Sequence, residues 1–508
     1  MADKSQKLQT DLIFKAHDAI TQINELAAAL DKVSNIKFNN VTTLMGSMRN
    51  AITKIAESSN DSTKVQKTNA EVVKTLIQQQ TKLIREMQKE YAKVGKGVVD
   101  LLQMNGHLIA EQTDTQIHIK HVLVRDIEKY KNVGLDENLH LTDNFKDIIE
   151  DDEVEIVVEV MGSADFAKAC IEECFRHGKS VVSANKDVIA DCGIGLLKLA
   201  QENGADFQFE ASVAGGIPII RPMYSSLNAN QIEEIIGIMN GTTNYILTNM
   251  TDRGLTYEEA LKEAQEKGYA EADPTSDVGG FDAARKIAIL AKLGFHAYVN
   301  VKDVSIEGIE GVTKEDIAHA TAMGYAIKLL AVAEKNTDGI SLAVHPAFVP
   351  KDHPLANVGA AYNAVYVRGN CVGDVMLYGQ GAGSLPTASA VVSDIMNVIQ
   401  HINTEMTGKR PYLWHETAVK DAAENKAPYY IRLIAANAPG VLANMSGVFA
   451  KHGISIRSLI QKDETKEAAE IVILVDSTPC KTVRLALNEI EQLTCIHRIC
   501  NAIRVIEV

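Results

Sequence analysis

The residues best suited to chemistry gather in one acid-rich stretch, residues 268–286, which reads GYAEADPTSDVGGFDAARK. Its carboxylates are Glu271, Asp273, Asp277 and Asp282. Pro274, together with Gly279 and Gly280, predicts a shaped loop rather than a helix before residue 281. Several carboxylates in one such loop can surround a small cation.

Asp282 and Lys286 lie four residues apart at the start of a largely apolar run, so a helix there places both on one face. Each side chain then holds the other in its charged form. An ordinary salt bridge on a helix surface has the same spacing and is common. The loop before it favours a functional site, because a solvated surface helix does not need an acid-lined approach shaped by proline.

A second candidate is the run Ser183, Ala184, Asn185 and Lys186, at the end of a strand expected over residues 180–184. Ligands of open α/β sheets bind beyond the carboxyl ends of the strands, so Lys186 stands where a cofactor or substrate would bind. A solvated lysine at the start of the next helix is the alternative.

A third candidate is the glycine-rich run GQGAG at residues 379–383, just before an expected helix. Backbone amides in such a run can approach an anion closely. A tight turn without any ligand has the same composition, so this signal alone is weak.

The elements that position these groups alternate between strand and helix over residues 97–210. Expected strands cover residues 116–124, 154–160, 180–184 and 206–210, and expected helices cover residues 97–104 and 164–177. The apolar run 154–160 is typical of a strand buried on both faces. This order predicts a parallel, doubly wound sheet of the Rossmann type.

Two further modules are expected beyond residue 205. Residues 231–344 mix strand-like runs with helices over 257–267 and 283–293, which predicts a second α/β domain. The polar stretch 403–427 predicts a connector. The expected elements after it are strand 429–434, helix 440–452, strand 455–461, strand 470–475, helix 480–491 and strand 502–508. That order is ferredoxin-like.

The N-terminal region has a different pattern. Apolar residues recur at three- and four-residue steps in two stripes: Ile13, Ala16, Ile20, Ile23, Ala27 and Leu30, then Val65, Val72, Leu76, Leu83 and Met87. Such heptads predict a helical hairpin or coiled coil that packs, oligomerises or binds an unknown partner.

The bulk composition limits the functional classes. A chain of 508 residues is expected to hold three or four domains. Its formal net charge of −15 disfavours nucleic acid and anionic lipid as partners. No signal peptide or membrane span is expected, and the seven cysteines lack a C-x-x-C pair, so a cytoplasmic protein with reduced thiols is predicted.

Five motifs in order resemble homoserine dehydrogenases that carry a C-terminal ACT domain. They are SANKDVIA, FEASVAGGIPII, IMNGTTNYIL, GYAEADPTSDVGGFDAARK and LYGQGAGSLPTASAVVSDI. The resemblance covers residues 94–508. It implies an oxidoreductase that interconverts L-aspartate 4-semialdehyde and L-homoserine with NAD(P)H, in the biosynthesis of threonine, methionine and isoleucine.

The resemblance also implies roles for individual residues. Lys286 is similar to the proton donor of the family, with Asp282 beside it and Lys186 near both nicotinamide and substrate. The residues implied to bind the amino acid are Glu271, Asp277, Tyr269 and Thr242, and those implied to bind the cofactor are Val94, Gly95, Arg125, Ser183, Asn185, Lys186 and Gly381. Arg125 resembles the residue that meets the 2′-phosphate, so NADP is preferred over NAD.

Two further sites are implied. Glu210, Val213, Gly215 and Ile217 match a loop whose oxygens, mostly from main-chain carbonyls, hold a monovalent cation such as sodium. Residues 436–443 resemble the first turn of ACT domains, which bind amino acids and pair between chains. Threonine is therefore an expected effector, and a homodimer or homotetramer is the expected assembly. Asn437 stands where the family usually has aspartate.

The chain departs from the family pattern at the glycine-rich loop. Glu90 and Ala92 occupy the first two glycine positions, and Gly95 occupies the last. The expected fold is therefore an N-terminal helical extension (1–93), an incomplete Rossmann-like domain without its first strand (94–205), a catalytic and dimerisation domain (206–402), a connector (403–427) and an ACT domain (428–508). The alternative to a dehydrogenase with a weakened cofactor site is a degenerate fusion that only oligomerises or binds amino acids.

Overall fold

The computed structural model describes residues 93–130, 139–409, 412, 414–463, 465 and 467–507. The expected N-terminal helices, including Glu90 and Ala92, lie outside these residues. Residues 93–160 and 174–507 belong to one compact unit, whereas residues 161–173, in which helix α6 (Ala164–Arg176) begins, belong to another. None of the helices described is long and apolar enough to cross a bilayer.

The part of the chain before residue 210 forms parallel strands in two separate sheets among the described residues. One sheet pairs β1 (His121–Leu123) with β2 (His140–Thr142). The other has the order β3 (Ile156–Glu159), β4 (Ser180–Ser183) and β5 (Phe207–Gln208). The connecting helices are α4 (Ile127–Tyr130), α5 (Lys146–Ile149) and α7 (Lys186–Glu202).

A helix from late in the sequence completes the core of this part. Helix α14 (Ser384–Asn403) shares one buried apolar cluster with helix 93–113 and strand β4. The contact is close, since a Cβ on Gly97 would stand 2.6 Å from Ser384 Oγ. Ser384 Oγ also donates to the Lys93 carbonyl at 2.6 Å. Sequence reasoning placed α14 in the catalytic domain and did not predict this packing.

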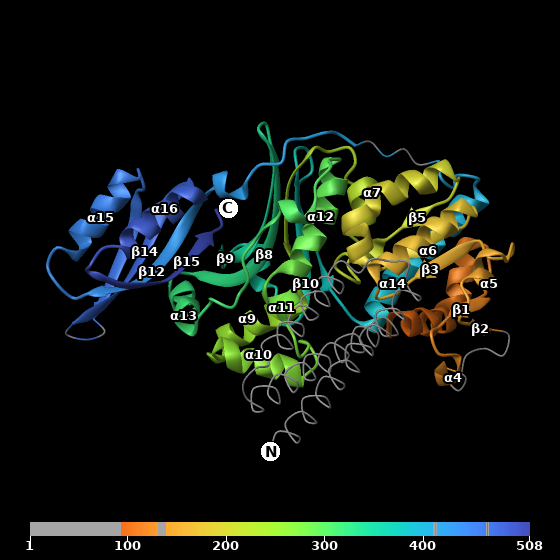
Figure 1. Ribbon diagram of the computed structural model, residues 1–508, viewed down its shortest axis with the longest axis horizontal. Coiled ribbons are helices and arrows are strands. Elements are labelled where there is room, and N and C mark those ends of the chain that lie inside the picture. Colours follow the sequence, from red (N-terminus) through yellow and green to blue (C-terminus); the bar gives the residue numbers. More distant parts are fainter. Residues whose placement is uncertain are drawn as a thin grey trace, which may run out of the picture. The chain divides into compact units, whose positions relative to one another are not determined.

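The part expected to be catalytic is built on strands in the order β11-β10-β6-β8-β9. Their bounds are β6 Ile232–Ile238, β8 Tyr325–Asn336, β9 Gly339–Pro350, β10 Tyr362–Gly369 and β11 Gly373–Gln380. A short strand, β7 (Ser305–Ile306), pairs with β9. Helix α12 (Phe281–Phe295) lies against β6 and β8 (Figure 1). Since its residues after 286 are almost all apolar, α12 is buried nearly all round.

The remaining elements of this part are helices and 3₁₀ turns. The helices are α8 (Ile220–Tyr224), α9 (Gly241–Arg253), α10 (Tyr257–Glu266), α11 (Thr275–Val278) and α13 (Lys314–Ala322). Single 3₁₀ turns cover Glu210–Ser212, Val301–Asp303, Pro354–Asn357 and Ala422–Glu424.

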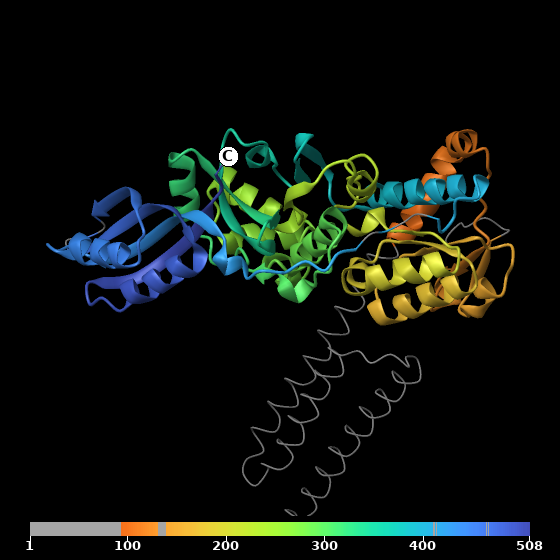
Figure 2. The ribbon, with the colours of Figure 1, turned by 90° about the horizontal axis from the view of Figure 1, so that it is seen from above.

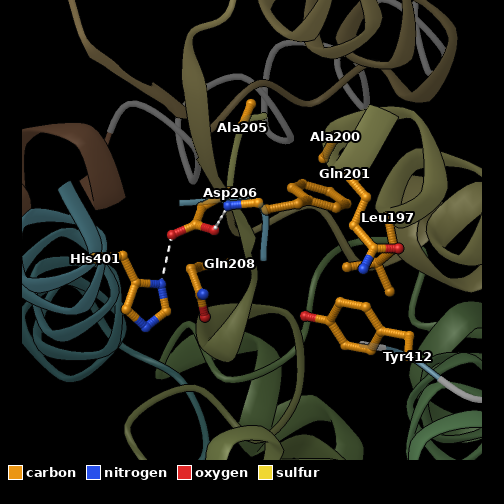
Figure 3. Close-up of a pocket in the computed structure, with 10 residues that line it drawn as sticks. Leu197, Ala200, Gln201, Ala205, Asp206, Gln208, His401 and Tyr412 are labelled. Carbon is orange, nitrogen blue, oxygen red and sulfur yellow. Dashed lines mark hydrogen bonds and ion pairs between the residues drawn. The ribbon is translucent and has the colours of Figure 1, made fainter. Parts of the chain in front are cut away.

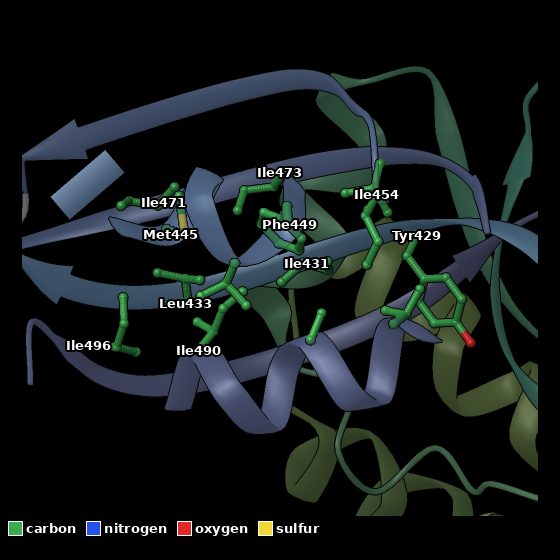
Figure 4. Close-up of a cluster of buried hydrophobic side chains, with 14 of the residues drawn as sticks. Tyr429, Ile431, Leu433, Met445, Phe449, Ile454, Ile471, Ile473, Ile490 and Ile496 are labelled. Carbon is green, nitrogen blue, oxygen red and sulfur yellow. The ribbon is translucent and has the colours of Figure 1, made fainter. Parts of the chain in front are cut away.

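The C-terminal module has the predicted ferredoxin-like order. It consists of β12 (Lys426–Ala436), α15 (Val441–Lys451), β13 (Ile456–Asp463), β14 (Ala468–Pro479), α16 (Cys480–Glu491) and β15 (Ile496–Val505). Its antiparallel sheet has the order β15-β12-β14-β13, and both helices cover one face of it (Figure 2). Side chains of the sheet and helices, such as Leu433, Phe449 and Ile490, pack together in a largely apolar core (Figure 4).

This module is joined to the catalytic part by backbone pairing. Strand β15 runs parallel to β9, with Arg504 opposite Ala347 and Val505 opposite Phe348. The two sheets are therefore one continuous sheet of ten strands. The sequence did not predict this junction, because nothing in the pattern of one strand specifies a partner so distant along the chain.

Several predicted elements need correction. The strand predicted over 116–124 is limited to His121–Leu123, and the strand predicted over 206–210 to Phe207–Gln208. Strand β3 is half-buried rather than buried on both faces. The loop before Phe281 contains the one-turn helix α11, and the last strand begins at Ile496, earlier than predicted. For these three strands, 116–124, 206–210 and the last one, apolar alternation gave the element type correctly, but the limits depend on tertiary hydrogen bonds. The helical turn α11 was missed, because Pro274 and the two glycines favour a loop over a helix.

Candidate active site

Helix α12 presents Asp282 and Lys286 as a contact pair. Lys286 Nζ lies 2.6 Å from Asp282 Oδ2 and also donates to the Met239 carbonyl at 2.7 Å. Gly280 caps the helix at φ 86°, a conformation that favours glycine, and a Cβ there would stand 2.9 Å from Val344 Cγ1. An ammonium group has three N–H donors, so Lys286 can still donate one to a ligand.

Helix α7 brings the second lysine to the same carboxylate. Lys186 is the first residue of α7, and its Nζ lies 3.5 Å from Asp282 Oδ1. Asn185 caps this helix by accepting from Val188 N–H at 3.3 Å. The structure thus brings the three predicted catalytic residues together, although 96 positions separate Lys186 from Asp282 in the sequence.

Ser183 and Asn185 lie around a buried carboxylate at the end of β4. Ser183 Oγ donates to Glu159 Oε2 at 2.6 Å, and Asn185 N–H donates to Ser183 Oγ at 3.1 Å. All three residues are buried. This arrangement fixes the turn from β4 into α7 and thereby the position of Lys186.

The two carboxylates of the site have opposite pKa shifts. Burial alone would favour the neutral form of Asp282, but the charges of Lys286 and Lys186 outweigh it and lower its pKa well below the usual range. Burial, followed by the charge of Asp282, raises the pKa of Asp277. Asp282 is therefore an anion at neutral pH that stabilises two cations.

The residues predicted to bind the amino acid lie beside this pair. Asp277, in α11, accepts from Asn240 Nδ2 at 2.7 Å. Thr242 Oγ1 donates to the Tyr269 carbonyl at 2.6 Å, and the Tyr269 ring, which is 47% exposed, stacks on Tyr245. Glu271 is half-buried on the same loop.

Asn240 was not among the predicted site residues. It is 5% exposed and its side-chain amide contacts both Asp277 and Asp282. The sequence did hold a signal, because an asparagine directly before Gly241 and a helical run is typical of a helix cap. That signal says nothing of the carboxylates, which lie elsewhere in the sequence.

The glycine-rich run 379–383 packs closely on the loop after β5. Gly216 N–H donates to the Gln380 carbonyl at 3.0 Å, and a Cβ on Gly215 would stand 2.4 Å from the Gly381 carbonyl oxygen. Gly381 is crowded on its other side, since a Cβ there would be 2.0 Å from Nδ2 of the buried Asn363. The run leads directly into α14, whose N-cap residue, Gly383, provides no side-chain cap.

Comparison with known proteins identifies the family. The family model described as "Homoserine dehydrogenase" matches residues 218–396, that described as "Homoserine dehydrogenase, NAD binding domain" matches residues 93–210, and "ACT domain" matches residues 429–495. The chain is 43% identical over 424 residues to the homoserine dehydrogenase of Synechocystis sp., covering 81% of this chain and 97% of that protein. The chain belongs to the homoserine dehydrogenase family.

Further homoserine dehydrogenases agree in sequence and structure. That of Bacillus subtilis is 41% identical, with 81% of this chain and 96% of that protein covered. The crystal structure of a homoserine dehydrogenase from Thiobacillus denitrificans superposes with a TM-score of 0.77 at 38% identity, covering 82% of this chain and 96% of that chain. A hyperthermophilic archaeal homoserine dehydrogenase in complex with NADPH has a TM-score of 0.51 at 26% identity, covering 64% of this chain and 97% of that chain.

The remaining predicted cofactor residues are Val94, Gly95 and Arg125. Val94 and Gly95 are helical, within the helix 93–113, and Val94 packs against the apolar cluster that includes α14. A Cβ on Gly95 would make only an ordinary 3.5 Å contact with Val160. Arg125 is exposed just beyond the carboxyl end of β1, where cofactors of this fold bind.

The predicted cation loop is highly ordered by its own hydrogen bonds. The Glu210 carboxylate accepts from the backbone N–H groups of Ile219, Ile220 and Arg221 at 2.6–2.7 Å. Burial raises the pKa of Glu210, and burial with the Glu210 charge raises the pKa of Asp394 to about 7. The Glu210 carbonyl accepts only a long 3.5 Å hydrogen bond from Val213. The Glu210 carboxylate is therefore engaged by backbone donors of the segment 219–221.

A separate pocket lies where the connector leaves α14 (Figure 3). His401 Nδ1 lies 2.6 Å from Asp206 Oδ2, and Gly408 N–H donates to the other Asp206 oxygen at 2.9 Å. The pocket is lined by Leu197, Ala200, Gln201, Ala205, Asp206, Phe207, Gln208, His401, Gly408 and Tyr412. These contacts attach the start of the connector to β5. Across the described residues, no group of three or more His, Cys, Asp and Glu side chains is arranged to hold a metal ion.

Proposed function

We propose that the chain catalyses the NADP(H)-dependent interconversion of L-aspartate 4-semialdehyde and L-homoserine. The observation that carries this proposal is the convergence of Lys186 and Lys286 on opposite oxygens of Asp282. Hydride transfer to an aldehyde builds negative charge on its oxygen, and a positioned ammonium group neutralises that charge. A nicotinamide cofactor would supply the hydride when bound.

In the proposed mechanism, Lys286 gives a proton to the aldehyde oxygen to complete the hydroxyl group, and takes it back in the reverse reaction. Asp282 orients this ammonium, together with the Met239 carbonyl. Lys186 lies near both reactants. Glu271 and Asp277 bind the ammonium of the amino acid, with Tyr269 and Thr242 lining the same pocket.

NADP is the proposed cofactor because Arg125 is exposed at the end of β1, where a guanidinium can meet the 2′-phosphate. Val94, Gly95, Ser183, Asn185 and Gly381 are proposed to line the remainder of this site.

A monovalent cation such as sodium is proposed at the oxygens of the following residues: Glu210, Val213, Gly215 and Ile217. Positive φ angles at Ala214 (55°) and Gly215 (52°) support it, because they give this loop a shape that few sequences adopt.

The ACT module suggests regulation by an amino acid, and threonine is the proposed effector. Its first turn is shaped by Gly440 at φ 93°, and Asn437 N–H donates to the Glu467 carbonyl at 3.0 Å.

A homodimer or homotetramer in the cytoplasm is the proposed assembly and location. The proposed domain limits are those expected from the sequence, with a connector over 403–427.

The test is a homoserine-dependent assay of NADPH formation by the full chain. Lys286→Met is expected to lower kcat by about 10²-fold or more. The matched control is Lys262→Met, because Lys262 is an exposed lysine in the same domain, and it should keep full activity. Absence of activity in the unmodified protein, with no NADPH binding in a fluorescence titration, would favour the degenerate alternative. Arg125→Ala should raise KM for NADP more than KM for NAD.

A further inference from the structure

Two carboxylates with different proposed roles, Asp277 and Asp282, lie side by side in the candidate site. Asp277 belongs to α11, and Asp282 to the first turn of α12. Both are acceptors of the same side-chain nitrogen, Asn240 Nδ2, at 2.7 Å and 3.0 Å. Like charges this close repel, and the raised pKa of Asp277 reflects burial and that repulsion.

The orientation of the Asn240 amide follows from its other contacts. Its Oδ1 accepts from Thr243 N–H at 2.9 Å and so caps α9. A flipped amide would turn its oxygen towards two carboxylates and its NH₂ group towards the Thr243 N–H donor, so the hydrogen bonds to both carboxylates and from Thr243 N–H would be lost. The NH₂ group therefore faces the carboxylates, with one hydrogen available for each.

The backbone around Asn240 is fixed as well. The carbonyl of the preceding residue, Met239, accepts from Lys286 Nζ at 2.7 Å. The next residue, Gly241, packs closely against Ala361. A Cβ atom added to Gly241 would lie only 2.9 Å from the Ala361 carbonyl oxygen. A short segment thus contacts the proton donor and both carboxylates, and it has little room to move.

We propose that Asn240 is a positioning residue that sets the separation between the carboxylate that binds the amino acid (Asp277) and the carboxylate that orients the proton donor (Asp282). This inference rests on the proposed function. Asn240 has no expected contact with the reacting atoms. It acts by holding the amino end of the substrate at a fixed distance from Lys286.

Loss of the Asn240 amide has two consequences. Substrate binding weakens, because Asp277 is no longer held in place. Asp277 also loses a hydrogen bond that favours its charged form, so it protonates at a higher pH. The charged groups that set the titration of Asp277 are Asp282 and Lys286 of α12. Its hydrogen-bond donors are Asn240 and Thr242 at the start of α9. Lys186 of α7 lies beside Asp282 and lowers the pKa of that carboxylate.

The experiment compares steady-state homoserine oxidation in three variants of the full chain. Asn240→Ser keeps a neutral cap for α9 but cannot reach both carboxylates. Asn240→Asp keeps the shape and the cap but replaces the donor with a third carboxylate. Thr256→Ala is the control, because Thr256 caps α10 at a half-buried position and its loss weakens a helix without touching the site.

For Asn240→Ser, KM for homoserine should rise about tenfold or more, whereas KM for NADP should stay within about twofold. The acid limb of kcat/KM should move to higher pH. Asn240→Asp should lose more activity, and Thr256→Ala should match the unmodified enzyme. Unfolding temperatures confirm that each variant folds, and Asn240→Asp still tests the inference if Asn240→Ser unfolds.

An unchanged KM for homoserine and an unchanged acid limb in folded Asn240 variants would overturn this inference alone. A fall in kcat with both KM values unchanged would also overturn it, because that pattern indicates damage to the proton donor rather than to substrate positioning. Failure of the unmodified protein to oxidise homoserine would overturn the proposed function, and this inference with it.

Discussion

Lys186 lies 3.5 Å from Asp282, and this contact joins the first turn of α7 to the first turn of α12. The same two helices are joined by Asp187 and Arg285 at 2.7 Å. Lys198, near the end of α7, donates to the Tyr298 hydroxyl at 3.0 Å. The position of Lys186 relative to the proton donor is therefore set by the packing of α7 on α12, not by local sequence.

Replacement of Lys186 tests whether it acts on the reaction. Lys186→Met should lower kcat/KM for homoserine by about 10²-fold or more, because Asp282 loses one of its two cations and the reacting oxygen loses a nearby positive charge. Lys198→Met is the matched control on the same helix and should stay within about twofold. Equal losses in the two variants would show that only the packing of α7 matters.

The sequence predicted the charged centre of the site because its residues carry local signals. Asp282 and Lys286 share a helical face, and Lys186 follows a strand, so their element types and positions were predictable. Their convergence on one carboxylate was not, since the distance between α7 and α12 depends on packing between distant segments. Asn240 was missed for the same reason, since its cap signal says nothing of its carboxylate partners.

In the fold as well, features that depend on local sequence were predicted, whereas contacts between segments distant in the sequence were not. The ferredoxin-like order after residue 428 was predicted from alternation and is confirmed. The pairing of β15 with β9 and the packing of α14 with helix 93–113 were not predicted. Edge pairing and the sharing of a core between distant segments depend on surfaces that exist only after both parts have folded.

Gly381 should not tolerate a side chain. In Gly381→Ala the new Cβ would stand 2.0 Å from Nδ2 of the buried Asn363, so either Asn363 or the loop must shift. NADPH affinity should fall about tenfold or more, because the loop that leads into α14 moves. Fluorescence titration with NADPH measures this change.

The control for Gly381→Ala is Gly195→Ala, at an exposed position of α7 where a Cβ meets no atom within 4 Å. It should leave NADPH affinity unchanged and stabilise the helix by roughly 0.5–1 kcal/mol. Unchanged affinity in Gly381→Ala would show that this loop does not contact the cofactor.

Lys328 should make stability depend on pH above neutrality. Its ammonium is buried and donates to the Val358 carbonyl at 2.6 Å and to Asn244 Oδ1 at 3.2 Å, and burial lowers its pKa to about 8. In the unfolded chain the pKa is about 10.4, so the unfolded state binds more protons between these values. Stability should therefore rise with pH between about 8 and 10, by roughly 1–3 kcal/mol.

Urea unfolding at pH 7.5 and pH 9.5 measures this rise. Lys328→Met should abolish it, whatever its effect on absolute stability, because the titrating group is gone. Lys335→Met, on the same strand, should retain it. An equal pH slope in the unmodified protein and in Lys328→Met would assign the titration to another group.

A buried ion pair joins the ACT module to the catalytic part. Arg432 Nε of β12 lies 2.7 Å from Asp316 Oδ1 of α13, and both side chains are buried. Tyr430 and Asn501 also donate to Asp316, at 3.0 Å and 2.9 Å. Burial favours the neutral form of Asp316, but the hydrogen bonds from Arg432 and Asn501, together with the Arg432 charge, outweigh it and lower its pKa.

Arg432→Met should lower stability by about 3–5 kcal/mol at pH 7, because it leaves a buried carboxylate without its cation. Arg457→Met is the control on the same module, since Arg457 pairs with Asp476 and Glu507 at the surface and such pairs contribute about 0–1 kcal/mol. In the unmodified protein, the depressed pKa of Asp316 adds stability that is present above about pH 4 and lost below it. In Arg432→Met the pKa of Asp316 rises, so the variant should lose less stability relative to the unmodified protein at pH 5 than at pH 7. A loss that is small, or the same at both pH values, would show that Arg432 does not stabilise a charged Asp316.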